Sequence, residues 1–162
     1  MKKVITLLLA LQVTFCYSQT LPNFDDVRLE QGSDYKTAEP TVMKAATYIL
    51  STPFEKNDIS RLKSMQFLIK WMSGTPDYTF TLDDVAGKIT KGNDDLLGTY
   101  MACMTKYCID HPESSKDPSA VKINSLKMLL EYCENSANNM KMTKQLRKLS
   151  EANKKGELEK EL

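Results

Sequence analysis

Apolar residues recur along most of the chain at intervals of three and four, which is the spacing of amphipathic helices. The first such stripe consists of Val42, Ala45, Ala46 and Ile49. It follows Pro40, and a proline is well tolerated in the first turn of a helix. We therefore expect a helix that begins near Pro40 and ends before Pro53, preceded by an irregular segment over residues 19–36.

A second helix is predicted after Asn57 and Asp58, either of which can serve as its N-cap. Its stripe consists of Ile59, Leu62, Met65, Ile69 and Met72. Phe67 and Trp71 add a second apolar flank, so we expect this helix to lie centrally in the fold. Gly74 is typical of the position just after a helix, and Pro76 prevents its continuation.

The remaining helices are marked by their capping residues. A short helix is predicted over residues 83–90, and Asn93 caps a long one that Pro112 ends. The stripe of that long helix is Leu97, Met101, Met104, Cys108 and His111. Asp117 and Pro118 start another helix, with the stripe Leu126, Leu129, Leu130 and Cys133. A last helix presents Met142, Leu146 and Leu149, and the charged residues 151–162 are expected to form a solvated tail.

Strand-like alternation occurs only over residues 78–82, and one such segment cannot build a sheet. The predicted fold class is therefore all-α, with five to six helices in a domain over residues 37–150.

The two halves of this domain resemble each other. Residues 48–53 (YILSTP) match residues 107–112 (YCIDHP) at an offset of 59. After a two-residue insertion, residues 65–72 (MQFLIKWM) match residues 126–133 (LKMLLEYC). One helical hairpin cannot bury its apolar face alone, so an internal duplication predicts two stacked units, residues 37–92 and 93–150.

The N-terminus has the layout of a secretory signal peptide. Lys2 and Lys3 precede an apolar run of about a dozen residues, which is shorter than the roughly 20 that span a bilayer. We expect residues 1–18 to be removed by cleavage between Ser18 and Gln19. The protein is then exported, to the periplasm or the extracellular medium, and no membrane span is expected in the mature chain.

Charge and cysteine content narrow the possible functions. The formal net charge of +1 becomes −1 once the signal peptide and its two lysines are removed, so no basic excess points to nucleic acid. The mature chain keeps Cys103, Cys108 and Cys133. The first two lie about 140° apart on a helix and cannot bond to each other, whereas a bridge from Cys133 to either stays open. Three reduced core cysteines are the favoured interpretation.

The side chains that catalysis requires are sparse. The only histidine, His111, stands at a helix end, where it is expected to face the terminal carbonyls. The acidic pairs are Asp25 and Asp26, Asp83 and Asp84, and Asp94 and Asp95. The last two pairs begin predicted helices, where the helix dipole favours negative charge. We therefore expect no catalytic and no cofactor-binding residues, and predict that the protein is not an enzyme.

One constellation suggests a metal. Met101, Met104, Cys108 and His111 lie on one face of one predicted helix, and their thioether, thiol and imidazole groups suit Cu(I). The same positions form the core stripe, so packing is the favoured interpretation and we expect no metal site.

An aromatic patch is a second candidate site. Trp71, Tyr78 and Phe80 flank the turn at residues 74–77. Trp71 is expected in the core, and the segment with Tyr78 and Phe80 is the better candidate for a surface contact.

Three segments support a resemblance to a group of proteins. They are WMSGTPD (residues 71–77), NDDLLG (93–98) and LLEYCEN (129–135). Together with the signal peptide, they resemble small secreted helical proteins of Bacteroidetes-type bacteria. This resemblance implies an all-helical fold and carries over no activity and no functional residue.

Export, a duplicated helical architecture and the missing catalytic motifs favour a module that binds another protein of the cell envelope. Two alternatives stay open: a ligand carrier or enzyme with a site between the two units, and an extracytoplasmic Cu(I)-binding protein. The sequence leaves the oligomeric state open.

Overall fold

The computed structural model describes residues 21–162, and these residues form an all-helical bundle with no strand among them. The predicted fold class is confirmed. The six α-helices are α1 (Gly32–Ser51), α2 (Ile59–Gly74), α3 (Asp84–Thr90), α4 (Asp94–Asp110), α5 (Pro118–Glu134) and α6 (Lys144–Lys154). Three short 3-10 helices, η1 (Phe24–Asp26), η2 (Ser136–Asn138) and η3 (Leu158–Glu161), complete the described chain.

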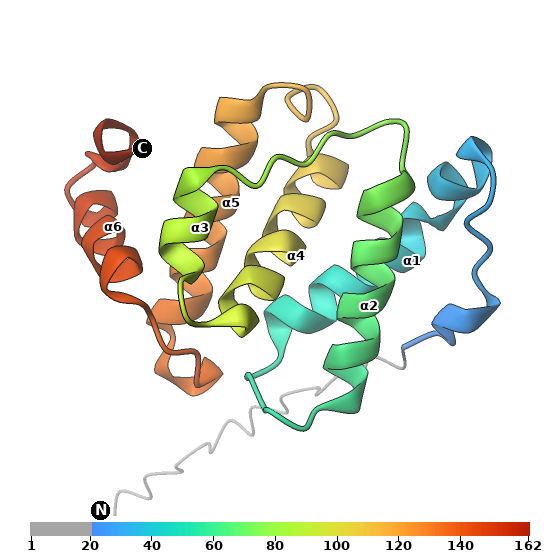
Figure 1. Ribbon diagram of the computed structural model, residues 1–162, viewed down its shortest axis with the longest axis horizontal. Helices are drawn as coiled ribbons and strands as arrows, with labels where there is room; N and C mark the ends of the chain where they lie inside the picture. The colour runs from blue at the N-terminus through green and yellow to red at the C-terminus, as the bar shows by residue number, and fades with distance from the viewer. Residues whose placement is uncertain (1–20) are drawn as a thin grey trace, which may run out of the picture.

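Helices α1 and α2 lie at one side of the molecule and α6 at the other, with α4, α5 and α3 between them (Figure 1). Helix α4 is the centre of the bundle, because it packs against α1, α2, α3 and α5. It is accordingly buried on nearly every side, including Leu96, Tyr100, Cys103 and Tyr107. Our expectation that the 59–74 helix is the central one was wrong.

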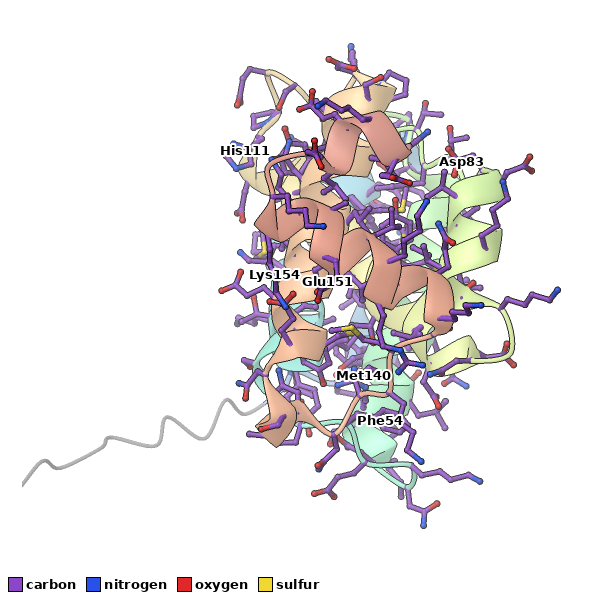
Figure 2. The ribbon with its side chains drawn as sticks, turned by 90° about the vertical axis from the view of Figure 1, so that its left-hand side faces the viewer. Phe54, Asp83, His111, Met140, Glu151 and Lys154 are labelled. Carbon is purple, nitrogen blue, oxygen red and sulfur yellow. The ribbon has the colours of Figure 1, made fainter. Side chains whose placement is uncertain are left out.

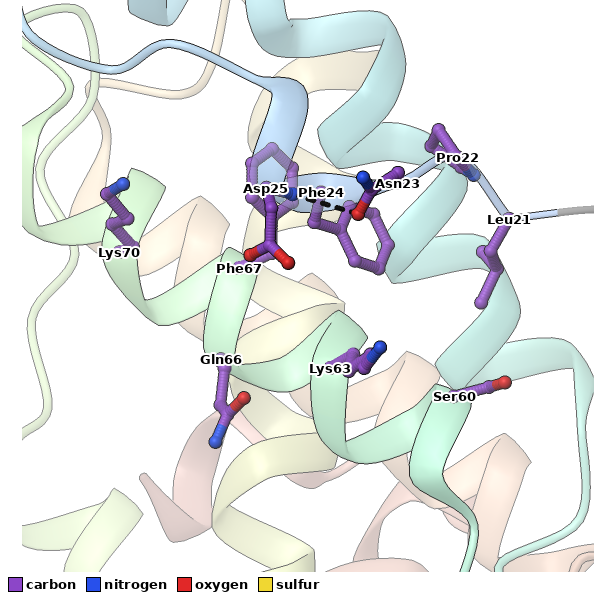
Figure 3. Close-up of a pocket in the computed structure, with 10 residues that line it drawn as sticks. All are labelled: Leu21, Pro22, Asn23, Phe24, Asp25, Ser60, Lys63, Gln66, Phe67 and Lys70. Carbon is purple, nitrogen blue, oxygen red and sulfur yellow. Dashed lines mark hydrogen bonds between the residues drawn. The ribbon is translucent and has the colours of Figure 1, made fainter.

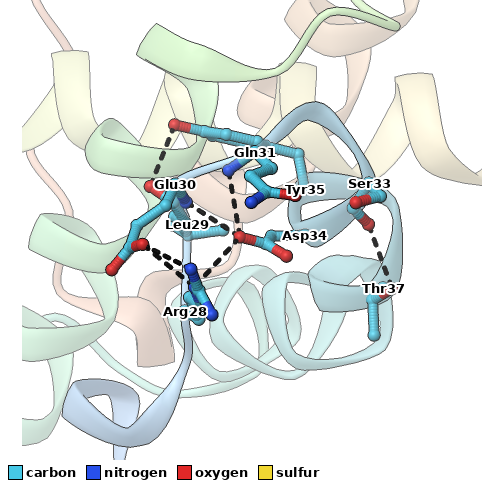
Figure 4. A network of polar contacts seen from close by, with 8 residues as sticks. All are labelled: Arg28, Leu29, Glu30, Gln31, Ser33, Asp34, Tyr35 and Thr37. Carbon is cyan, nitrogen blue, oxygen red and sulfur yellow. Dashed lines mark hydrogen bonds and ion pairs between the residues drawn. The ribbon is translucent and has the colours of Figure 1, made fainter.

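The first helix begins earlier than predicted. Gly32 is its first residue, and Pro40 lies inside it instead of in its first turn. The carboxylate of Asp34 explains this start, since it accepts hydrogen bonds from the backbone N–H groups of Glu30 and Gln31, each at 3.0 Å (Figure 4). These bonds stabilise a helix N-terminus, which compensates in part for the backbone hydrogen bond that Pro40 removes. The irregular segment predicted over residues 19–36 therefore ends at Gln31 within the described chain.

The other predicted N-caps are confirmed, whereas Gly74, expected just after the helix, is the last residue of α2 and Thr75 is its C-cap. Asp58, Asn93 and Asp117 each accept a backbone hydrogen bond at the start of α2, α4 and α5. Asp83 does the same for α3, and Thr143 for α6. The stripes of α1 and α5 are also buried as expected.

The C-terminal tail is part of the bundle, contrary to our prediction of a solvated segment. Helix α6 continues to Lys154, and the turn η3 then folds back onto it. Leu158 in η3 is only 3% exposed. Charged residues dominate the composition of the tail, so its sequence predicts a solvated segment despite the buried Leu158.

Residues 1–18 and the predicted cleavage between Ser18 and Gln19 lie outside the described residues. Within residues 21–162, no helix is both long and apolar enough to cross a bilayer.

Candidate functional site

The outer face of α2 is the most unusual surface of the described chain. Four large apolar side chains are exposed to solvent in residues 21–162, and three of them, Ile59, Leu62 and Ile69, belong to α2. Their exposed fractions are 69%, 58% and 43%. Leu62 and Ile69 are two helical turns apart on the same side, about 10 Å along the axis. We call Ile59, Leu62 and Ile69 the α2 apolar face.

This arrangement reverses the sequence prediction for α2. The stripe of Ile59, Leu62, Met65, Ile69 and Met72 was expected in the core, whereas the structure exposes three of these residues and half-buries the other two. The second flank is the buried one, with Phe67 at 5% exposure and Leu68 and Trp71 at 0%. Aromatic side chains bury more area than aliphatic ones, so the orientation that hides Phe67 and Trp71 prevails.

A buried arginine also fixes the rotation of α2. Arg61 is 7% exposed and donates hydrogen bonds to the carbonyl oxygen of Ile49 at 2.8 Å and to Oγ1 of Thr99 at 3.0 Å. Its guanidinium also lies 5.6 Å from the ring centroids of Phe54 and Tyr132. Arg61 thereby joins α2 to α1 and α4, and with Phe67 and Trp71 buried as well, the side of α2 that carries Leu62 and Ile69 faces outward. Arg61 has no periodic signature in the sequence that would indicate its burial.

Trp71 anchors the other end of α2. Its indole N–H donates to the carbonyl oxygen of Tyr35 at 2.9 Å, and Tyr78 and Phe80 lie at 5.6 and 6.0 Å between ring centroids. Trp71 is in the core, as predicted. Tyr78 is only 8% exposed and Phe80 is half-buried. The prediction that these two rings offer a surface contact was therefore wrong for Tyr78, which Trp71 draws into the core.

Two lysines flank the α2 apolar face. Lys63 and Lys70 are exposed, and neither forms an ion pair within residues 21–162. Both also line a groove of about 660 Å³ between α2 and the segment around η1, whose Phe24 stacks on Phe67 with ring centroids 4.7 Å apart (Figure 3). The outer side of α2 thus combines apolar side chains with unpaired positive charge.

The residues proposed as Cu(I) ligands lie in different surroundings. Met104 and Cys108 are buried in the core, Met101 is half-buried, and the side chain of His111 is 52% exposed. The ring of His111 lies 4.8 Å from that of Tyr107, and its Nδ1 is 3.3 Å from Oε1 of Glu113. His111 caps α4 through its backbone N–H, which donates to Tyr107, while its side chain points outward (Figure 2). The expectation that the imidazole faces the terminal carbonyls is therefore not met.

Cys103, Cys108 and Cys133 are buried and unbonded. Burial raises the pKa of Cys108 to about 11 and, with the nearby charge of Glu134 contributing, that of Cys133 to about 12. Burial raises the pKa of Cys103 as well. Thiols in this state are protonated near neutral pH, so they are poor nucleophiles and poor metal ligands.

The three acidic pairs lie in η1 and at the N-termini of α3 and α4. Asp94 and Asp95 occupy the first turn of α4, and Asp25 and Asp26 belong to η1. Asp83 caps α3 and forms an ion pair with Lys122 of α5. Partial burial works against the charge of Asp83, but the hydrogen bonds from Lys122 and from the backbone of α3 outweigh it and lower its pKa.

Two pockets lie between the two predicted units. One pocket of about 230 Å³ lies between the α2–α3 connection and helices α4 and α5, where the pair Asp83 and Lys122 lines it. It is smaller than typical ligand pockets of about 300–1,000 Å³. The other pocket, of about 380 Å³, lies between Leu50 of α1 and helices α4 and α5. His111 and Cys108 line neither pocket.

No protein-family model, curated protein or solved structure matches this chain. The functional argument therefore depends on the fold and on the α2 surface.

Proposed function

We propose that this protein is an exported, non-enzymatic α-helical module that binds another protein of the cell envelope through the α2 apolar face. The observation that carries the proposal is the exposure of Ile59, Leu62 and Ile69 along one helix. Removing an exposed leucine or isoleucine from water yields about 1.5–3 kcal/mol when burial is complete. A helix that leaves three such side chains in solvent has a surface suited to a partner.

The size of this surface bears on the strength of binding. Specific complexes bury about 800 Å² on each partner, which is more than three side chains provide. The interface must therefore extend over neighbouring groups, and Lys63, Lys70 and the adjoining groove supply them. An apolar centre with a charged rim is the usual arrangement of such interfaces.

The test is crosslinking in intact cells followed by purification of the tagged protein and mass spectrometry. The wild type is compared with the double variant Leu62→Ser/Ile69→Ser. The matched control is Lys127→Ser/Glu131→Ser, which changes two exposed residues on α5. We expect one reproducible partner with the wild type and with the control, and its loss with the double variant. Equal recovery from all three proteins, or no partner from any, would contradict the proposal.

A further inference from the structure

The two halves of the bundle place their helix ends at matching positions. The C-cap of α1 is Thr52 and that of α4 is His111, 59 residues later. The N-caps of α2 and α5, Asp58 and Asp117, are also separated by 59 residues. The N-caps of α3 and α6 are separated by 60. The structure therefore repeats the offset found in the sequence.

Helices α2 and α5 also bury corresponding side chains. At an offset of 61, Ser64, Leu68 and Trp71 correspond to Ser125, Leu129 and Tyr132, and all six are buried. Three of the five buried positions of α2 thus have buried counterparts, whereas the counterparts of Arg61 and Phe67, Lys122 and Met128, are half-buried. The neighbouring faces can be compared at the same offset.

The neighbouring faces differ in what covers them. Ile69 of α2 is 43% exposed, whereas its counterpart on α5, Leu130, is 1% exposed. Met65 and Met72 are half-buried, whereas their counterparts Leu126 and Cys133 are buried.

The amphipathic helix α6 lies across this side of the molecule and contacts the C-terminal end of α5 at Cys133 and Glu134 (Figure 2). Helix α6 buries Leu146 and Leu149 completely, and Ser150 donates a hydrogen bond to Glu134 at the end of α5 at 2.5 Å. The third helix of the first half, α3, packs instead against α4 and α6. The C-terminal half of α2, around Ile69 and Met72, therefore lacks the kind of helix that α6 supplies to α5, and the counterparts of Ile59 and Leu62, Ala120 and Ile123, are half-buried.

We propose that the α2 apolar face binds an amphipathic α-helix of the partner protein, in the place that α6 occupies on α5. This inference rests on the proposed protein-binding function and specifies the partner. The charge of α2 defines the partner further, because α2 carries Arg61, Lys63 and Lys70 and no acidic residue. The docking helix presents acidic side chains to Lys63 and Lys70 beside its apolar stripe.

Charge argues against two other occupants. Helix α6 of a second copy carries Lys144, Arg147, Lys148 and Lys154 against a single acidic residue, Glu151, so it would repel Lys63 and Lys70. An anionic membrane surface is recognised by clusters of about four to eight basic residues, and this face has two exposed lysines.

The experiment uses the purified protein and two fluorescent 18-residue helical peptides in an anisotropy titration. Both peptides carry leucines at the spacing of Leu146 and Leu149, and their flanking residues are glutamates in one and lysines in the other. We expect the acidic peptide to bind about tenfold more tightly than the basic one. Lys63 and Lys70 form exposed ion pairs with the glutamates of the first peptide and repel the lysines of the second. The variant Lys63→Glu/Lys70→Glu should reverse this preference.

The variant Leu62→Ser/Ile69→Ser should weaken binding of the acidic peptide about tenfold or more, with an unchanged circular dichroism spectrum as the folding control. Absence of binding by both peptides, or binding that neither double variant changes, overturns the inference. Binding to phosphatidylglycerol vesicles that depends on Leu62 and Ile69, without peptide binding, would assign the face to a membrane instead. If crosslinking finds a partner on α2 while no peptide binds, the protein-binding function stands and only the helical partner is refuted.

Discussion

At the scale of single residues, the cysteines behave as core side chains. Cys103, Cys108 and Cys133 are buried, and burial raises the pKa of each thiol. A rise of two units, such as that of Cys108 from 9.0 to about 11, lowers the thiolate fraction on the order of a hundredfold.

We therefore predict that these thiols react with a disulfide reagent such as Ellman's reagent at pH 8 far more slowly in the folded protein than in denaturant. Because the folded pKa values lie above the unfolded ones, the same groups stabilise the fold below about pH 9, and this contribution declines as the pH rises further. Rapid labelling of the folded protein at a rate that denaturant does not change would contradict the burial of these thiols.

Substitution of alanine for glycine is expected to change the free energy of unfolding in opposite directions at two positions. A Cβ at Gly74 would overlap the ring of Tyr35, whereas a Cβ at Gly87 would meet nothing within 4 Å. We expect Gly74→Ala to lower the free energy of unfolding by about 1–3 kcal/mol through overpacking. Gly87→Ala should raise it by up to about 1 kcal/mol, because alanine favours the helix. Denaturant titrations of both variants measure these changes. A lower free energy of unfolding for both variants, or for neither, would refute the packing described around Gly74.

At the scale of helices, the ion pair of Asp83 with Lys122 ties α3 to α5. The pKa of Asp83 is lowered in the folded state, so its contribution to stability is complete above about pH 4 and declines as the pH falls through the folded value. Asparagine also caps helices well, so Asp83→Asn removes the charge and preserves the cap. We expect this variant to be less stable than the wild type at pH 7, with a smaller loss of stability between about pH 5 and pH 2. Urea titrations across this range measure the stability of both proteins. If the charge of Asp83 contributes nothing, the stability of the wild type and that of Asp83→Asn will change in parallel with pH.

The turn η3 holds the C-terminus against α6 through Leu158, which is 3% exposed. Leu158→Ala is expected to cost about 2 kcal/mol, at the low end for a buried leucine because the site is close to the chain end. Glu159→Ala, at an exposed position in the same turn, is the control and should change stability by less than about 0.5 kcal/mol. Thermal unfolding distinguishes the two variants. Equal unfolding midpoints for Leu158→Ala and Glu159→Ala would contradict the burial of Leu158 and favour a solvated tail.

At the scale of the whole molecule, periodicity and capping residues were enough to predict the all-helical fold and most helix starts. Asp58, Asn93 and Asp117 cap helices in the structure as their sequence context indicates. The start of α1 was missed because Asp34, inside the helix, bonds backward to Glu30 and Gln31.

The candidate site was missed for a different reason. Helix α2 carries two apolar flanks, and periodicity alone cannot tell which of them faces the core. The contacts that decide the orientation come from distant parts of the chain: Arg61 bonds to Ile49 and Thr99, and Trp71 bonds to Tyr35. The greater volume of Phe67 and Trp71 is the one local signal that favours the observed orientation.

The central claim is that α2 presents its apolar face to a partner protein. The most direct measurement is site-specific photo-crosslinking in living cells, with a photoreactive amino acid at Ile69 and, as a control, at Lys127 on the exposed side of α5. We predict one strong crosslinked product from position 69 that is absent from position 127. No product from position 69, or the same products from both positions, would contradict the claim.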